Sequence, residues 1–288
     1  MTLKTLNPEA KKHPCPDCTF CQWCGDDRCA LCLRSCCGAS VKKLSVKEQI
    51  ALYDEINCDR GIVAPSPGET VDELKEYSLR IIQPENGYRF SLDPLLLCNF
   101  VPVPAGSILD LGTGCGIMPL VLARKFPDSS LVGVEVQPEM AELARRNVEL
   151  NQLTERISIL EADILDLSAS YKADSFDLVI ANPPYRRSGT GKISPKKGRD
   201  LARHESTANL ADFLSIARKM VKPEGRIILI YHPERLPELM AAACRLKLSA
   251  QRLQMVHGSL DAPARMFMIE LFKGRGGALQ VLPVLLVR

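Results

Sequence analysis

The sequence lacks several features that would place it at once in a familiar class. No apolar run reaches the ~20 residues that a membrane-spanning helix needs, and residues 1–15 are polar and charged, unlike a signal peptide. The chain also has no large excess of charge of either sign, because 37 basic and 34 acidic residues leave a net charge of only +3. We therefore expect a cytoplasmic protein without membrane contact, in which a local patch provides any contact with nucleic acid.

The common phosphate-binding patterns are missing from the chain's glycine-rich turn. The strand-like run Ser107 to Leu111 leads into Gly112-Thr113-Gly114-Cys115-Gly116, and a helical stretch follows. The spacing Gly-x-Gly-x-Gly differs from the dinucleotide fingerprint, and no Lys-Ser/Thr pair follows as in a phosphate loop. This favours a ligand without phosphates, which approaches the backbone at Gly112, Gly114 and Gly116 and places an amino-bearing group near the Asp110 carboxylate.

Two further acids follow strand-like runs. Glu135 ends the run Leu131 to Glu135, about 20 residues after the glycines, where a carboxylate can accept hydrogen bonds from both hydroxyls of a ribose. Asp163 follows another apolar run and can accept a hydrogen bond from the amino group of an adenine. An amine, a ribose and an adenine occur together in S-adenosylmethionine, which we predict as the cofactor.

The tetrapeptide Asn182-Pro183-Pro184-Tyr185 follows the apolar run Phe176 to Ala181, so it should lie where a buried strand leaves the sheet. Two prolines make a rigid turn, in which the Pro183 carbonyl and Asn182 can accept both hydrogens of an exocyclic amine while Tyr185 stacks on its ring. Such residues also form ordinary turns. The glycine-rich turn earlier in the sequence favours a binding role for the tetrapeptide over an ordinary turn. We therefore predict Asn182, Pro183 and Tyr185 as catalytic residues, with Asn182 also beside the cofactor.

With these motifs the chain resembles class I S-adenosylmethionine-dependent methyltransferases and, more narrowly, the bacterial tRNA(Val) adenine-N6 methyltransferase family. The narrow resemblance covers about residues 77–288. It depends on the glycine turn and on three other segments: Gly87 to Leu97, Ala202-Arg203-His204-Glu205 and Ala262-Pro263-Ala264-Arg265. It implies S-adenosylmethionine as cofactor and methylation of an adenine N6 in tRNA near the anticodon. Asp93 either caps a helix or, as the resemblance implies, also lies near the methionine end of the cofactor.

The order of elements predicts an α/β fold. Strands and helices alternate from residue 107 to 245, and two final strands, about Ala250 to His257 and Arg265 to Phe272, should form an antiparallel hairpin. The expected fold is a Rossmann-like, seven-stranded, mostly parallel sheet with this antiparallel hairpin at its end. We also expect a short helix at Thr70 to Tyr77, a hairpin within Leu79 to Phe90, and a tail, Ala278 to Val287, that adds a strand or covers an edge. The predicted domains are residues 1–40, a helical connector at 41–76, and the methyltransferase domain at 77–288.

Cysteines are concentrated near the start of the chain, in pairs with the spacing of metal ligands. Eight thiolates could complete two tetrahedral zinc sites in a small metal-binding module. An iron–sulfur cluster is the rival, and an oxidisable tail is the plain alternative. The candidate ligands are Cys15, Cys18, Cys21, Cys24, Cys29, Cys32, Cys36 and Cys37.

The segment after the tetrapeptide is basic and rich in glycine, so it could follow RNA phosphates while a base enters the site. A solvated charged loop is the alternative. The candidate RNA ligands are Arg186, Arg187, Lys192, Lys196, Lys197, Arg199 and Arg203. We expect a monomer that acts on tRNA. Rival interpretations are methylation of a release-factor glutamine or of a guanine N2 in ribosomal RNA, and, from another class, a metal-dependent RNA-binding adaptor with an inactive methyltransferase domain.

Overall fold

The computed structural model describes residues 63–86, 89–102, 106–184, 208–274 and 276–287, together with Ser45. The cysteine-rich segment and the N-terminal part of the expected connector lie outside these residues. The domain boundaries drawn from the sequence therefore stay predictions. In the described part of the chain, no helix is long and apolar enough to cross a membrane.

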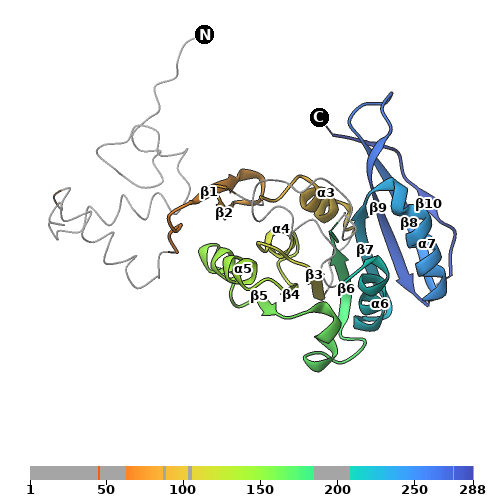
Figure 1. Cartoon of the computed structure of the whole chain (residues 1–288), viewed down its shortest axis with the longest axis horizontal. Helices are drawn as coiled ribbons and strands as arrows, with labels where there is room; N and C mark the ends of the chain where they lie inside the picture. Colours follow the sequence, from red (N-terminus) through yellow and green to blue (C-terminus); the bar gives the residue numbers. More distant parts are fainter. Residues whose placement is uncertain are drawn as a thin grey trace, which may run out of the picture. The chain divides into compact units, whose positions relative to one another are not determined.

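The main sheet has the predicted mixed arrangement (Figure 1). Its parallel strands are β3 (Ser107–Leu111), β4 (Ser130–Glu135), β5 (Ile157–Glu161), β6 (Phe176–Ala181) and β7 (Val221–Tyr231). The antiparallel pair is β8 (Leu248–His257) and β9 (Ala264–Lys273), with β9 between β8 and β7. The strand order is β10-β8-β9-β7-β6-β3-β4-β5. The seven predicted strands are thus confirmed, but the sheet has nine strands among the described residues, because two short strands of the tail join it.

The tail after β9 extends the sheet, as expected. Two short strands, β10 (Gln280–Val281) and β11 (Leu285–Leu286), both pair in parallel with β8. Between them the Leu282 amide donates to the Leu253 carbonyl at 2.8 Å. The tail therefore covers the backbone groups at one edge of the sheet, which would otherwise lack partners.

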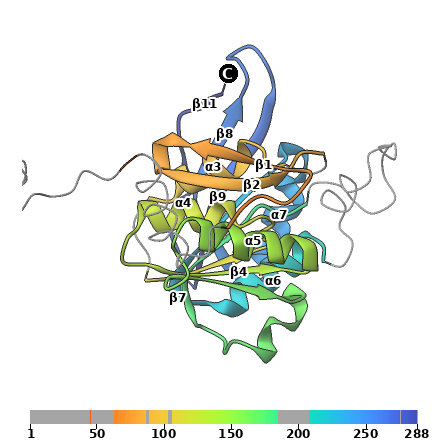
Figure 2. The ribbon, with the colours of Figure 1, turned by 90° about the vertical axis from the view of Figure 1, so that its left-hand side faces the viewer.

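Helices cover both faces of the sheet and divide the core into two layers (Figures 1 and 2). The first layer contains α3 (Asp93–Phe100), α4 (Ile117–Lys125) and α5 (Pro138–Leu150). The second contains α6 (Leu210–Met220) and α7 (Leu236–Arg245). The described residues also form three short 3₁₀ helices, η3 (Lys75–Tyr77), η4 (Ile164–Ala169) and η5 (Pro233–Arg235). Alternate residues of each strand face the two layers, which gives both faces an apolar surface.

The segment before the sheet differs from the prediction. Residues Glu69–Leu74 form strand β1, which pairs antiparallel with β2 (Leu79–Pro84), from Glu69 opposite Pro84 to Leu74 opposite Leu79. The helix expected at Thr70 to Tyr77 is wrong, because only Lys75–Tyr77 is helical, and it forms the turn of this hairpin. The hairpin expected within Leu79 to Phe90 is also wrong. Long-range burial of β2 against α5 outweighs the local turn signal at Pro84 to Gly87.

Asp93 does not cap the helix that follows. It is the first residue of α3, and no side-chain capping hydrogen bond forms at Leu92, the residue in the cap position. Instead, the Ser91 hydroxyl donates to Oδ2 of Asp93 at 2.9 Å. Pro94 follows in the first turn, where its missing N–H leaves no helical hydrogen bond unmade.

Candidate active site

The glycine turn follows β3 at the carboxyl edge of the parallel strands. Gly112, Gly114 and Gly116 all have positive φ, at 76°, 57° and 83°, a conformation that glycine adopts without a steric penalty. The Gly112 and Thr113 amides both donate to one carbonyl oxygen of β4 at 2.9 Å. A Cβ on Gly116 would lie 3.3 Å from the Cβ of Ala144 on α5. The glycines therefore permit both the tight turn and its close contact with α5.

A cavity opens beside this turn and brings most of the predicted cofactor residues together. Its wall includes Gly112, Gly114, Glu135, Asp163 and Asn182. Gly116 and Asp110 do not line it. The wall also includes residues that the sequence did not single out, among them Phe90, Pro94, Thr113, Gln137, Met140 and Phe213.

Glu135 ends β4 and is held in one orientation by two backbone amides. Its Oε2 accepts from the Gly114 amide at 2.9 Å, and its Oε1 accepts from the Gln137 amide at 3.0 Å. The residue is 6% exposed, and burial raises the pKa of its carboxyl, while these hydrogen bonds act in the opposite direction. Each oxygen keeps a second lone pair, so the carboxylate can still accept hydrogen bonds from a ligand.

Asp110 lies beneath the turn instead of on the cavity wall. It is 1% exposed, and neither carboxyl oxygen has a hydrogen-bond partner among the described residues. Burial raises the pKa of Asp110 to about 7; the Thr113 hydroxyl beside it lowers this pKa, and the charge of Glu135 raises it further. The Thr113 hydroxyl lies close enough to Asp110 to lower its pKa. It makes no hydrogen bond of good geometry, because the Thr113 oxygen, like those of Asp110, has no partner among the described residues. Direct contact between Asp110 and a ligand stays a prediction.

Asp163 lies on the cavity wall at the start of η4. Its Oδ1 accepts from the Leu165 amide at 3.0 Å, and this bond caps the 3₁₀ turn. The side chain is partly buried. Its second oxygen is therefore available to a donor on a ligand.

Asn182 and Pro184 reach the same cavity from the end of β6, which lies between β3 and β7. Pro183, the predicted catalytic proline, is buried and does not line the cavity, so the role of its carbonyl stays a prediction. The Tyr231 hydroxyl, at the end of β7, donates to the Pro184 carbonyl at 3.0 Å. Tyr231 is fully buried, and the Arg235 guanidinium lies 5.3 Å from the centre of its ring. The sequence did not single out Tyr231, because only the pairing of β6 with β7 brings it under the Asn-Pro-Pro turn.

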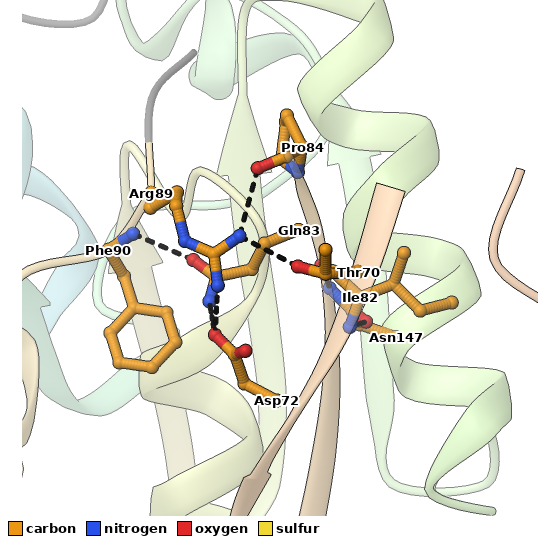
Figure 3. Close-up of polar contacts among 8 residues, drawn as sticks. All are labelled: Thr70, Asp72, Ile82, Gln83, Pro84, Arg89, Phe90 and Asn147. Carbon is orange, nitrogen blue, oxygen red and sulfur yellow. Dashed lines mark hydrogen bonds and ion pairs between the residues drawn. The ribbon is translucent and has the colours of Figure 1, made fainter. Parts of the chain in front are cut away.

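A hydrogen-bond network joins Arg89 and Phe90 to the β1/β2 hairpin (Figure 3). Phe90 and the nearby Pro94 line the cavity. The Arg89 guanidinium forms an ion pair with Asp72 and donates to Thr70 Oγ1 at 2.7 Å and to the Pro84 carbonyl at 3.0 Å. The Phe90 amide donates to Gln83 Oε1 at 2.9 Å. These bonds fix the direction in which the chain leaves the hairpin toward α3.

Asn147 on α5 joins the hairpin to the glycine turn. Its amide accepts from the Ile82 N–H at 2.7 Å and donates to the Ile82 carbonyl at 3.1 Å and the Cys115 carbonyl at 3.0 Å. The side chain is fully buried. An internal amide with three such bonds holds β2 and the turn at a fixed separation.

Several predicted site residues lie outside the described residues. They are Tyr185, the basic segment from Arg186 to Arg203, and the eight N-terminal cysteines. Over the part of the chain that the structure does describe, no three His, Cys, Asp or Glu side chains are grouped to hold a metal ion. The zinc and iron–sulfur hypotheses therefore stay predictions.

The arrangement of the sheet and its helices is that of a methyltransferase domain. Residues 103–265, more than half of the chain, match the family model described as "Methyltransferase domain". The chain belongs to this family.

Within that class the chain is similar to proteins named tRNA1(Val) (adenine(37)-N6)-methyltransferase. The relative from Porphyromonas gingivalis strain ATCC 33277 is 38% identical over 156 residues, which are 52% of this chain and 60% of the relative. The relative from Vibrio campbellii is 27% identical over 190 residues, 66% of this chain and 77% of the relative. The chain thus spans about 60% of the length of the first curated relatives that it matches.

A solved structure shows the same fold. It is described as a predicted O-methyltransferase from Agrobacterium tumefaciens, with a TM-score of 0.54 and 24% identity, covering 68% of this chain and 86% of that one. At this identity the likeness concerns the fold alone.

Proposed function

We propose that the chain is an S-adenosylmethionine-dependent methyltransferase that methylates the N6 amino group of an adenine in tRNA near the anticodon. The observation that carries the proposal is the meeting of Asn182 and Pro184 with two carboxylates, Glu135 and Asp163, on the wall of one cavity. The names of the relatives support the choice of substrate.

The residues present fit this cofactor. Glu135 is held by backbone amides and keeps lone pairs for two ribose hydroxyls, while Asp163 keeps one oxygen for the adenine amino group. Asp110 lies behind the turn and has a raised pKa, so we propose that the positive charge of the cofactor favours the ionised carboxylate, which in turn attracts the cofactor's amino group. When bound, the cofactor supplies a methyl group on a positively charged sulfur. Asp110→Ala should weaken its binding, which calorimetry measures.

The chain's own groups prepare the nucleophile. An adenine N6 lone pair is delocalised into the ring, which makes the nitrogen a poor nucleophile. Hydrogen bonds from both N6 hydrogens to Asn182 and to the Pro183 carbonyl favour a pyramidal nitrogen and localise that pair. No side-chain base is needed before attack, because the N6 proton becomes acidic only as positive charge develops there; it then passes to water. Positioning supplies most of the rate.

The test combines a variant with a measurement in cells. Asn182→Ala should nearly abolish methylation while cofactor affinity measured by calorimetry stays unchanged; full turnover by the variant would refute the mechanism. Nucleoside mass spectrometry of tRNA from cells with and without the chain should show loss of N6-methyladenosine. Methyl incorporation into a release-factor glutamine or a ribosomal guanine instead would assign the chain to a rival substrate.

We also propose that the N-terminal cysteines bind zinc and that the basic segment from Arg186 to Arg203 contacts RNA. The support is the spacing of the cysteines and the position of the basic segment directly after the Asn-Pro-Pro turn. Elemental analysis of the purified protein should give about two zinc ions per chain, and Cys15→Ser should lower that number. Iron with acid-labile sulfide would favour the cluster, and a metal-free protein would contradict both.

A further inference from the structure

The Ala262-Pro263-Ala264-Arg265 segment leads into a β-bulge at the start of β9. Val256 of β8 pairs with Met266, whereas the next residue of β8, His257, pairs with Ala264. Arg265 is therefore the extra residue between two successive pairs. Bulges of this kind turn a side chain into a new direction and are common next to active sites.

The Arg265 side chain lies against Gly258, in the turn between β8 and β9. A Cβ at Gly258 would be only 2.7 Å from Nη2 and 2.8 Å from Cζ of Arg265, so glycine makes room for the guanidinium. Arg265 is exposed, and its guanidinium has no hydrogen bond or ion pair with any residue in the described part of the chain. Arg146 and Arg252, by contrast, pair with carboxylates. Asp261, in the same turn, does not pair with Arg265.

This guanidinium lies at the edge of the sheet that carries the candidate active site. Strand β9 is antiparallel to β7, with Tyr231 opposite Phe267, so β9 starts where β6 and β7 end. In Figure 1 the turn between β8 and β9 protrudes at that end of the sheet. His232 follows Tyr231, whose hydroxyl donates to the Pro184 carbonyl. The Nδ1 atom of His232 lies 3.2 Å from the Arg265 carbonyl oxygen. Two strand spacings, about 10 Å, separate β6 from β9.

We infer that Arg265 binds a phosphate group of the substrate RNA, next to the nucleotide whose base enters the cavity. The inference rests on the proposed function, since it assumes an RNA substrate. An unpaired guanidinium presents a planar fork of donors that matches two phosphate oxygens. The bulge redirects the Arg265 side chain, and Gly258 leaves room for the guanidinium in the turn between β8 and β9.

The first test compares Arg265→Gln with Arg245→Gln in the full-length protein. Arg245 is an exposed arginine at the end of α7, away from the carboxyl edge, so it is a matched control. RNA affinity is measured with a labelled tRNA transcript over roughly 50 to 200 mM salt. We expect Arg265→Gln to raise the Kd about tenfold and to reduce the slope of log K against log salt by about 0.7 to 0.9. Arg245→Gln and cofactor affinity should match the wild type.

The second test moves the guanidinium without removing its charge. Gly258→Ala places a methyl group where the guanidinium lies, and φ at this residue is not in the left-handed region, so the fold should tolerate it. We expect a smaller loss of tRNA affinity than for Arg265→Gln, and no further loss when the two changes are combined. Additive losses, or a Kd of Arg265→Gln equal to that of the wild type, would overturn the inference.

These outcomes separate this inference from the proposed function. If the wild-type protein neither binds nor methylates tRNA, the proposed function fails and the inference fails with it. If the wild type methylates tRNA and Arg265→Gln does so with the same KM and salt dependence, only the role of Arg265 is refuted.

Discussion

Replacing Tyr231 with phenylalanine removes one oxygen atom from beneath the Asn-Pro-Pro turn and keeps the aromatic ring. The lost hydroxyl donates to the Pro184 carbonyl at 3.0 Å, while the ring's contact with Arg235, which is itself paired with Glu238, is retained. Because the packing is kept, the change reports on the position of the turn. Tyr231 contacts no reacting atom, so it is a positioning residue.

The expected effect can be worked out from this one bond. A hydrogen bond of this kind contributes about 1 kcal/mol net, which corresponds to roughly a fivefold change in the fraction of molecules with the turn held in place. A displacement of about 1 Å in an active site lowers the rate by about a hundredfold. We therefore expect kcat of Tyr231→Phe to fall by about 5-fold to 100-fold. The melting temperature should fall by no more than about 4 °C.

The assay is methyl transfer to tRNA, with KM and kcat determined separately and cofactor affinity measured by calorimetry. Tyr171→Phe is the matched control, since Tyr171 packs on Phe176 at a ring distance of 5.2 Å, away from the Asn-Pro-Pro turn. We expect kcat alone to change in Tyr231→Phe and neither constant to change in Tyr171→Phe. A wild-type kcat for Tyr231→Phe, or a loss confined to cofactor affinity, would refute the argument.

Three other predictions concern the support of the cavity. Gly116→Ala should destabilise the protein by about 1 kcal/mol more than Gly68→Ala, because both residues have φ near 84° but only Gly116 has a close neighbour, Ala144; denaturant unfolding measures the difference. Asn147→Ala should cost about 3 kcal/mol of unfolding free energy, since it leaves buried backbone groups without partners, and a loss below about 1 kcal/mol would contradict this. From about pH 4 to about pH 7 the folded state keeps a proton on Asp110 that the unfolded state has lost, so stability should fall by up to about 4 kcal/mol as pH rises. Unfolding curves of Asp110→Asn should lack most of this dependence.

Much of the sheet could be predicted from the sequence because its strands are short apolar runs that end in turn residues. Phe176–Ala181 and Ile157–Glu161 are of this kind, and their periodicity decides the structure locally. The β1/β2 hairpin was missed because β1 is mostly polar, and its pairing depends on the burial of β2 against α5. The turn-forming residues Pro84 to Gly87 led to the wrong prediction that β2 pairs with the segment that follows it, whereas β2 pairs with β1.

In the candidate site too, some residues could be predicted from a local sequence pattern and others are placed only by tertiary contacts. Glu135 and Asp163 could be found because an acid at or just after the end of a parallel strand lies at the edge of the sheet where ligands bind. Phe90 and Tyr231 carry no such local signal, and tertiary contacts alone bring them there. Asp110 was placed on the correct strand, but the sequence could not show that the turn separates it from the cavity.

The hydrogen bonds from the Gly114 and Gln137 amides to the Glu135 carboxylate have a consequence for the kinetics of cofactor binding. A side chain already anchored at both oxygens has no rotamers left to lose, so capture of a nucleoside needs no rearrangement at this position. Rapid-mixing traces of cofactor uptake should then follow a single exponential whose rate rises linearly with concentration, without the plateau that a slow preceding isomerisation would impose.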